Sequence, residues 1–347
     1  MKKNFFFRNH FNHVNVALII KKMKKILIIS SNRLGDSILT SGLINHYKKI
    51  NKMNSLTFVC GDLPAKIFKH SRNIERLISL KKKKNSSHWF FLWFKVFLNF
   101  WDEIVDLRGS AISYFLFTKK RIISPYIDKD KKQKIHKVLS ISKFYNKKLL
   151  APKLDIQLKK IFRFENHFLS NYYKSFVAIA PGANWVPKQW PKENFVSLIK
   201  KLITDKKFNY CRFILIGSKN EKFIGDFICK SFNKGRIINL IGKPKLIEVC
   251  SILKKCKLFI GNDSGLMHLA AALKIPTVGL FGPSDIKQYS PWGNNTLSIK
   301  TPESPSELMD NEFFSPKNKV SLMKSLKVAK VEKEILNFHN KLNVTKK

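Results

Sequence analysis

The stretch GNDSGLMHLAAALKIPTVGLFGPSD, residues 261–285, decides the fold. It continues the β-rich apolar run KLFIG, and LMHLAAAL within it has apolar residues at helical spacing, so a strand leads directly into a helix. PTVGLFG then predicts a second strand. A strand–helix–strand unit is typical of a parallel sheet, in which ligands bind at the carboxyl ends of the strands. Asp263, Ser264 and His268 fall at that edge.

The start of this helix has the features of an anion site. Ser264 suits an N-cap, Gly265 lets the backbone come close to a ligand, and the free N–H groups of the first turn favour a phosphate. His268 lies about one turn further on, on the same side. The structural alternative is a capped helix with a satisfied core histidine, and the stretch in isolation leaves both open.

The same alternation of strand and helix runs through the chain on both sides of a less patterned region. Before it, strands are predicted at KILIIS, SLTFVCG, IERLISL, EIVDLRG and RIISP, with helices at about 36–49, 62–70 and 128–148. After it, strands are predicted at FVAIAPG, RFILIGS, RIINLIG, KLFIGND and PTVGLFG, with helices at about 192–204, 219–232, 245–254, 265–273 and a final one within 317–342. This pattern predicts two doubly wound α/β domains in tandem.

The pattern also sets the expected domain boundaries. We predict an N-terminal extension outside the fold at 1–22, a first domain at 23–160, a linker at 161–174, a second domain at 175–315, and a C-terminal helix and tail at 316–347. Met23 begins a second start-like MKK directly before the first strand. Arg8, His10 and His13 interrupt any signal-type apolar core, so we read no secretion signal.

Composition narrows the possible partners. The 347 residues are 44% apolar and carry a formal charge of +43, but 57 of the 66 basic residues are lysines, scattered along the whole chain. Nucleic-acid binders more often concentrate charge and use arginine, so this distribution favours anionic membranes or phosphorylated substrates over nucleic acid. The five cysteines form no CxxC pair and have no histidine at metal-ligand spacing, which indicates a reducing cytoplasm.

An aromatic segment, WFFLWFKVFLNFW at Trp89 to Trp101, stands apart. It is too short to span a bilayer as a helix. It fits either a buried helix or a helix that dips into the membrane interface, where Trp and Phe beside lysines are common. The sequence leaves both possibilities open.

The first strand–helix junction reads SSNRLGDSILTSGLINHYKK, residues 30–49. Only Gly35 precedes the acid, so this is not the dinucleotide-binding GxGxxG pattern. Asp36 fits either an N-cap or a general base that faces a cleft between the two domains.

The second domain offers two further strand ends. In APGANWVPKQWPKENF, Lys188 and the backbone amides around Ala183 and Asn184 can hold a diphosphate. In ILIGSKNEKFI, Gly217 ends the strand and Glu221 follows it at a position suited to a ribose hydroxyl.

The blocks RLGDSILTSGLI, DLRG, PGANWVPKQWPKENF and GNDSGLMHLAAALKIPTVGLFGPSD, in this order, resemble glycosyltransferase family 9, the heptosyltransferases of lipopolysaccharide assembly, over about residues 24–300. The resemblance implies the GT-B architecture, with two Rossmann-like domains facing a central cleft. It implies an acceptor bound by the first domain, ADP-heptose as the usual donor bound by the second, inversion at the anomeric carbon, and neither an obligatory metal nor another cofactor.

The resemblance also implies roles for individual residues. Asp36 matches the proposed base, Lys188 a lysine that neutralises the leaving diphosphate, and Glu221 an acid that binds the ribose. The implied donor site also includes Gly217, Asp263, Ser264, Gly265 and His268, beside Ala183 and Asn184. Arg33 and Arg108 lie at strand ends on the acceptor side, where an anionic sugar or lipid phosphate is expected.

The expected partners are a nucleotide-sugar donor and an anionic glycolipid acceptor, with peripheral contact at the cytoplasmic face of the inner membrane and no nucleic acid. The DKD at Asp128 to Asp130 is interpreted as solvated surface, because no strand end precedes it. Two rival readings are a sugar-nucleotide epimerase of similar architecture and an inactive GT-B protein that only binds nucleotide sugars.

Overall fold

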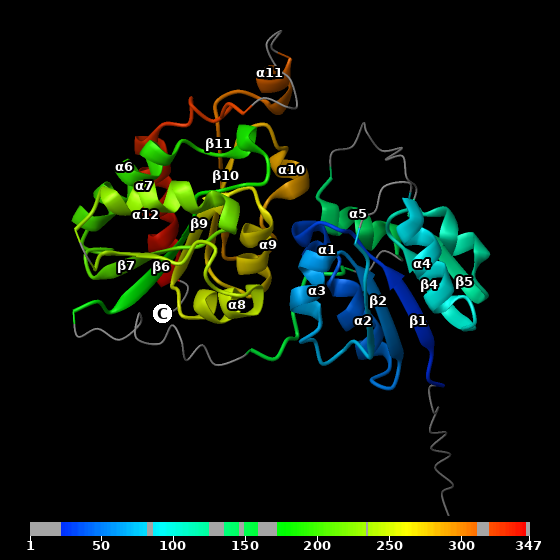
Figure 1. Cartoon of the computed structure of the whole chain (residues 1–347). Coiled ribbons are helices and arrows are strands. Elements are labelled where there is room, and N and C mark those ends of the chain that lie inside the picture. Colours follow the sequence, from blue (N-terminus) through cyan, green and yellow to red (C-terminus); the bar gives the residue numbers. More distant parts are fainter. Residues whose placement is uncertain are drawn as a thin grey trace, which may run out of the picture.

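The computed structural model describes residues 22–81, 86–124, 135–145, 149–158, 172–233, 235–310 and 319–344. Two parallel sheets, each accompanied by helices, form two α/β domains that meet at helices α1 and α9 (Figure 1). This confirms the predicted fold class. Residues 1–21, most of the predicted extension, lie outside the described residues, as do Asp128 to Asp130. The predicted domain boundaries stay a prediction.

The first domain is built on a five-stranded parallel sheet in the order β3-β2-β1-β4-β5. Its strands are β1 Lys25–Ile29, β2 Ser55–Cys60, β3 Arg76–Ser79, β4 Trp101–Asp106 and β5 Thr118–Ile123. Its helices are α1 Leu34–Leu39, α2 Gly42–Ile50, α3 Asp62–Phe68, α4 Ser87–Val96, the 3-10 turn η2 Ala111–Phe115 and α5 Lys137–Phe144. The central strands are continuous apolar runs because helices cover both faces of a parallel sheet.

Two predicted helices of this domain differ from the observed ones. The helix expected at 36–49 is two helices, α1 and α2, that break at Thr40. The buried Thr40 hydroxyl donates to the Ser37 carbonyl at 2.9 Å and contacts the Ser30 hydroxyl at 2.8 Å, which competes with the helical hydrogen-bond ladder. The helix expected at 128–148 covers only Lys137–Phe144 among the described residues, because His136 caps its start by accepting from the Val138 N–H.

The second domain has a six-stranded parallel sheet in the order β11-β10-β9-β6-β7-β8. Its strands are β6 Ser175–Ala180, β7 Cys211–Leu215, β8 Ile237–Asn239, β9 Leu258–Asn262, β10 Thr277–Phe281 and β11 Thr296–Lys300. Its helices are η4 Val186–Lys188, α6 Lys192–Thr204, η5 Lys219–Glu221, α7 Lys222–Lys230, α8 Leu246–Lys254, α9 Gly265–Ala272, α10 Ile286–Tyr289, α11 Pro305–Met309 and α12 Val328–Val344. β11 was not predicted, since it lies at the sheet edge and only Ile299 is buried.

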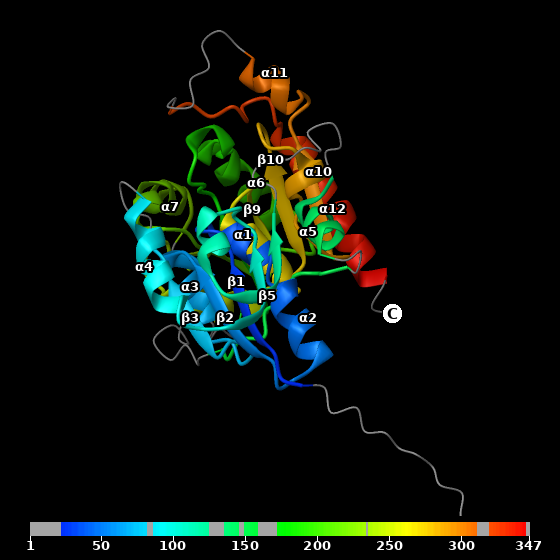
Figure 2. The same cartoon turned by 90° about the vertical axis from the view of Figure 1, so that its right-hand side faces the viewer.

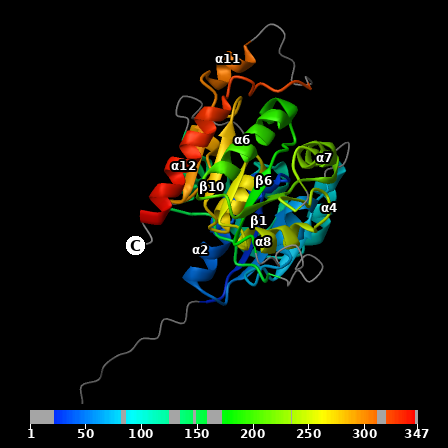
Figure 3. The ribbon, with the colours of Figure 1, turned by 90° about the vertical axis from the view of Figure 1, so that its left-hand side faces the viewer.

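The C-terminal helix packs back on the second domain, as expected. α12 runs beside α6 (Figure 3) and buries Val331, Ile335 and Phe338 at helical spacing. The buried side chains join the core that lies on the α6 side of the second sheet.

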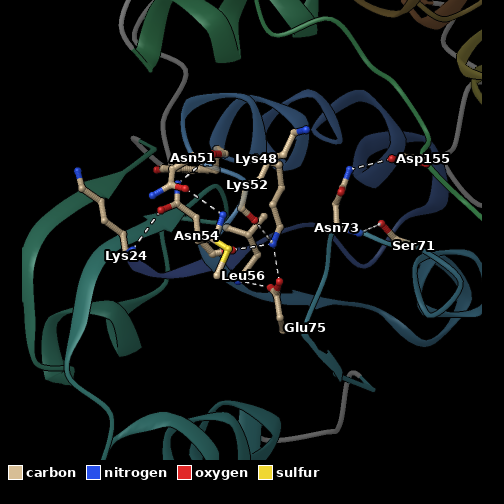
Figure 4. Close-up of polar contacts among 12 residues, drawn as sticks. Lys24, Lys48, Asn51, Lys52, Asn54, Leu56, Ser71, Asn73, Glu75 and Asp155 are labelled. Atoms are coloured by element: carbon tan, nitrogen blue, oxygen red, sulfur yellow. Dashed lines mark hydrogen bonds and ion pairs between the residues drawn. The ribbon is translucent and has the colours of Figure 1, made fainter. Parts of the chain in front are cut away.

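Polar contacts fix the amino-terminal edge of the first sheet, away from the strand ends that carry the predicted site (Figure 4). The Lys48 ammonium of α2 donates to the Asn54 carbonyl at 2.7 Å and pairs with Glu75. Glu75 also accepts from the Leu56 N–H of β2. Asn73 donates to Asp155 at 3.1 Å, which ties the segment before the predicted linker to this domain.

The two domains contact each other through the first turns of α1 and α9, which face each other in Figure 1. Figure 2 shows the first domain in front of the second. A β-carbon at Gly35 would lie 2.8 Å from the His268 ring, and one at Gly265 would lie 2.9 Å from the Leu34 β-carbon. Glycine therefore lets each helix approach a side chain of the other. A second contact joins His136 Nε2 to the Ser290 carbonyl at 2.9 Å.

We expect Gly35→Ala to destabilise the protein by about 1–3 kcal/mol, because the added methyl meets the buried His268 ring at a packed junction. Thermal or urea unfolding measures the change. In a His268→Ala background the same substitution should cost much less, since the ring is gone, and the double-mutant cycle isolates this coupling. Equal costs in both backgrounds would contradict the contact.

Candidate active site

The structure brings Lys188 and Asp263 together from loops that are 75 residues apart in the chain. Lys188 ends η4 in the loop after β6, and Asp263 directly follows β9, the neighbouring strand. The Lys188 ammonium donates to Asp263 Oδ2 at 2.7 Å, and the side chains are 29% and 7% exposed, respectively. The buried carboxylate thus holds a partly exposed cation at the carboxyl edge of the second sheet.

His268 lies against this pair. Its ring is 5% exposed, with Nε2 3.9 Å from Asp263 Oδ1, and Nδ1 has no hydrogen-bond partner among the described residues. Burial lowers the pKa of His268, while the carboxylates of Asp263 and Asp36 act in the opposite direction. The imidazole is therefore neutral near pH 7 and keeps hydrogen-bonding capacity. The alternative of a satisfied core histidine is wrong for Nδ1.

Ser264 occupies the N-cap position of α9, as predicted, but its hydroxyl makes no capping hydrogen bond. Its Oγ is buried without a partner among the described residues, and so is Oγ of Ser284, which follows β10. Buried polar atoms are normally hydrogen-bonded, so two such hydroxyls after adjacent strands fit a polar ligand. Ser284 was not predicted as a site residue, although it too follows a strand at the same edge of the sheet.

Gly265, the first residue of α9, was predicted to let the backbone approach a ligand. Its α-carbon faces Leu34 of α1, so the structure accounts for this glycine by packing between the two domains. A ligand contact of its N–H stays a prediction.

The remaining predicted donor residues gather around the loop after β6. Glu221 Oε2 accepts from the Ser218 N–H at 2.6 Å in a capping box, which accounts for one carboxylate oxygen structurally. A β-carbon at Gly182 would lie 2.2 Å from Glu221 Oε1, and one at Gly217 would lie 2.6 Å from Oε2. Both glycines therefore make room for this carboxylate beside the loop that carries Ala183, which is buried, and Asn184, which is exposed.

Asp36 lies on the other side of the junction. It is the third residue of α1, and the N-cap position belongs to Arg33, so the N-cap alternative for Asp36 is wrong. The carboxylate is half-buried and accepts from the Ser31 hydroxyl at 3.2 Å. It is close enough to influence the pKa of His268 across the junction. A carboxylate on the first domain therefore faces the cluster of Lys188, Asp263 and His268 on the second.

The two predicted acceptor arginines lie at neighbouring strand ends of the first sheet, Arg33 after β1 and Arg108 after β4. The side chain of Arg33 is exposed. Arg108 follows β4, donates through Nη1 to Asn32 at 3.3 Å and stacks over Trp89 with its guanidinium carbon 4.4 Å from the ring centroid. Arg108 is thus oriented by groups on both sides.

Asp106, the last residue of β4, positions Arg108 and was not predicted. Its buried carboxylate accepts from the backbone N–H of Arg108 at 2.8 Å and of Ser110 at 2.9 Å, and from the hydroxyls of Ser110 and Ser113. These hydrogen bonds fix the loop after β4. The sequence signal that could have identified Asp106 is an acid at the end of a predicted strand, followed within seven residues by Ser110 and Ser113.

The structure also bears on metal binding, disulfides and membrane-spanning helices. Among the described residues, no three His, Cys, Asp or Glu side chains are grouped to hold a metal ion, and all five cysteines are free thiols. Within the same parts of the chain, no helix has the length and apolar character to cross a membrane.

Comparison with known proteins identifies the family to which the chain is similar. A family model for glycosyltransferase family 9 (heptosyltransferase) matches residues 106–313. Lipooligosaccharide heptosyltransferase 2 of Campylobacter jejuni is 28% identical over 293 residues, which cover 79% of this chain and 86% of that protein.

Solved structures show the same fold. A glycosyl transferase family 9 protein from Veillonella parvula matches with a TM-score of 0.71 at 17% identity, over 91% of this chain and 97% of that one. The ADP-heptose lps heptosyltransferase II of E. coli matches with a TM-score of 0.69 at 19% identity, over 92% and 99%. The predicted GT-B architecture is thereby confirmed.

The buried histidines predict a pH dependence of stability. Burial lowers the pKa of His136 and His268 below the ordinary value of 6.5, so the unfolded chain binds protons there before the native state does. The free energy of unfolding should therefore fall as the pH drops below about 6.5, by up to about 1.4 kcal/mol per histidine and pH unit.

Urea unfolding at about pH 7.5 and about pH 5.5 tests this expectation. A variant with His136→Gln and His268→Gln should show a smaller loss between the two pH values. An unchanged loss in that variant would assign the effect to other groups.

Proposed function

The chain belongs to glycosyltransferase family 9, the heptosyltransferases, and with this family as the premise we propose that it transfers heptose from ADP-heptose to the core of lipopolysaccharide or a related glycolipid. The observation that carries the proposal is the junction of α1 and α9. There a half-buried carboxylate, Asp36, faces Lys188, Asp263 and His268 from the other domain.

The second domain supplies the donor side. The hydroxyls of Ser264 and Ser284 are buried hydrogen-bond donors that suit the oxygens of a diphosphate. Lys188 adds a positive charge that Asp263 holds in place. Both the relative from Campylobacter jejuni and the structure from E. coli are named heptosyltransferases, and the latter name specifies ADP-heptose, which supports this donor.

The proposed reaction is a single displacement. Asp36 takes the proton of an acceptor hydroxyl, and the oxygen forms a bond to C1 of the heptose while the bond from C1 to the diphosphate oxygen breaks. The ADP leaving group gains negative charge, which Lys188 and the serine hydroxyls stabilise. Attack opposite the leaving group inverts the anomeric carbon. Because Lys188 shares its charge with Asp263, the pair also keeps the cation oriented before the donor binds.

An inactive nucleotide-sugar-binding protein agrees less well with the site, because binding alone needs no carboxylate from the first domain facing the proposed donor cluster. A sugar-nucleotide epimerase would also need a proton-transferring group, so the family match is what favours the transferase over it.

The acceptor sets the place of action. A lipopolysaccharide precursor is an anionic membrane glycolipid, and the exposed Arg33 and the half-buried Arg108 supply cations at the strand ends on the acceptor side. We therefore place the enzyme at the cytoplasmic face of the inner membrane, as a peripheral protein.

Replacing Asp36 by Asn tests the proposed base. Asn retains an oxygen that can accept from the Ser31 hydroxyl, but it cannot take a proton, so turnover should fall by about 10² to 10⁴. Turnover is followed by the mass gain of one heptose on a deacylated lipopolysaccharide acceptor.

Calorimetry of the same variant with ADP-heptose provides the control. Donor affinity should stay within about twofold of the original, because the donor residues lie on the other domain. Near-normal turnover would refute the role of Asp36 as base. Loss of donor binding together with turnover would instead show that Asp36 holds the junction together.

A further inference from the structure

Helix α4 exposes an apolar face. His88, Leu92 and Val96 are buried at i, i+4 spacing, whereas Phe90 and Phe94 on the opposite side are 70% and 68% exposed. Leu98, two residues after the end of the helix, is 84% exposed. Helices with one buried face in a soluble protein normally carry polar side chains on the other. The aromatic segment is therefore not a fully buried helix, so the first of the two alternatives left open by the sequence is wrong.

The exposed face continues beyond α4. The Trp93 indole N–H donates to the Phe115 carbonyl at 3.1 Å, which joins α4 to η2. Around this link Tyr114, Phe115 and Phe117 are 66%, 71% and 68% exposed. We call the combined surface the α4–η2 face; it consists of Phe90, Phe94, Leu98, Tyr114, Phe115 and Phe117. Six large apolar side chains that are mostly exposed, on two elements in contact, indicate an interaction surface.

The charges around the α4–η2 face are positive. Lys95, Lys119 and Arg121 are exposed, with Lys95 over the Phe91 ring and Arg121 over the Tyr114 ring. Asp102 pairs with Lys119 at 2.9 Å and partly neutralises it, and the next residue, Lys120, pairs with the buried Glu103 at 3.6 Å. The face therefore combines exposed aromatic rings with exposed cations.

We propose that the α4–η2 face is the surface by which the protein docks on a bilayer that contains anionic lipids. α4 has ten residues, far fewer than a spanning helix needs, so it lies in the interface with its phenylalanines among the acyl chains and its lysines at the headgroups. Anionic lipids complement the exposed basic residues.

The position of the face relates it to the proposed acceptor site. Arg108 stacks over Trp89 near the start of α4, and its guanidinium also contacts Asn32, which lies four residues before Asp36. Figure 1 shows α4 and β5 on the side of the first domain that lies away from the second. If α4 docks on the membrane, Arg108 and the proposed acceptor site around it lie near the membrane surface. The link to a lipid acceptor rests on the proposed function, whereas the docking itself does not.

Vesicle sedimentation of the full chain tests the docking. The unchanged protein should sediment with vesicles of phosphatidylglycerol and phosphatidylethanolamine, and less so as salt rises. A variant with Phe90→Ser, Phe94→Ser and Leu98→Ser should lose at least about 100-fold in partition coefficient, because three apolar side chains no longer enter the bilayer.

A matched control removes three equally exposed apolar side chains elsewhere. Met53, Phe223 and Val344 are 70%, 62% and 74% exposed and lie outside the α4–η2 face. Replacing all three by Ser should leave vesicle binding unchanged. Equal binding by the α4 variant and the original, or no vesicle binding by either, would overturn the proposal. So would a change from dimer to monomer in the α4 variant without any lipid binding by the original, since the face would then bind a second copy.

A second measurement covers the case in which the triple variant does not fold. Leu98→Cys, at an 84% exposed position, is labelled with a polarity-sensitive fluorophore, and its emission should shift to the blue when the anionic vesicles are added. The same label at Met53→Cys should show no shift, and a silent label at position 98 would refute docking.

Activity separates this inference from the proposed function. The α4 variant should act normally on a deacylated acceptor and slowly on an acceptor embedded in vesicles. If the original protein binds vesicles but transfers no heptose to either acceptor, the docking surface stands and the proposed function fails.

Discussion

The close approach of α1 and α9 is the constraint on which the proposed active site depends. Each helix begins at the carboxyl end of a strand in its own sheet, and each carries a glycine where the other presents a side chain. Only glycine at positions 35 and 265 leaves space for His268 and Leu34. The two domains share a buried apolar cluster here, in which Leu34, Ile38 and Ile67 of the first domain join side chains of the second, at the two turns that carry the proposed base and the proposed donor residues.

The polar groups at this junction are arranged for a charged ligand. Asp263 is buried and would be costly without its ion pair to Lys188, since an unpaired buried charge destabilises a fold strongly. The pair satisfies the carboxylate and leaves part of the cation exposed. Ser264, Ser284 and His268 keep polar atoms that no described residue satisfies. The fold therefore tolerates several unpaired groups at the one edge where the proposed donor diphosphate would pair them.

Much of this arrangement follows from local sequence, and some of it does not. Buried parallel strands are short apolar runs, so nearly all of them were predictable, and α6 begins after Pro191 at the predicted residue. The break between α1 and α2 depends on a hydroxyl pair, Ser30 with Thr40, that only folding creates. The pairing of Lys188 with Asp263, 75 residues apart in the chain, likewise arises only when the chain folds. α4 is apolar on both sides, so periodicity could not separate its buried face from its exposed one.

The outer strand of the first sheet has a consequence for solubility. β5 lies at the sheet edge, with β4 as its one strand neighbour among the described residues, and an open edge invites pairing with a strand of another molecule. Three successive exposed basic residues, Lys119, Lys120 and Arg121, occupy its middle. Two such edges repel each other electrostatically. The basic residues near the aromatic rings of α4 and η2 thus also oppose edge-to-edge pairing of the sheets of two molecules.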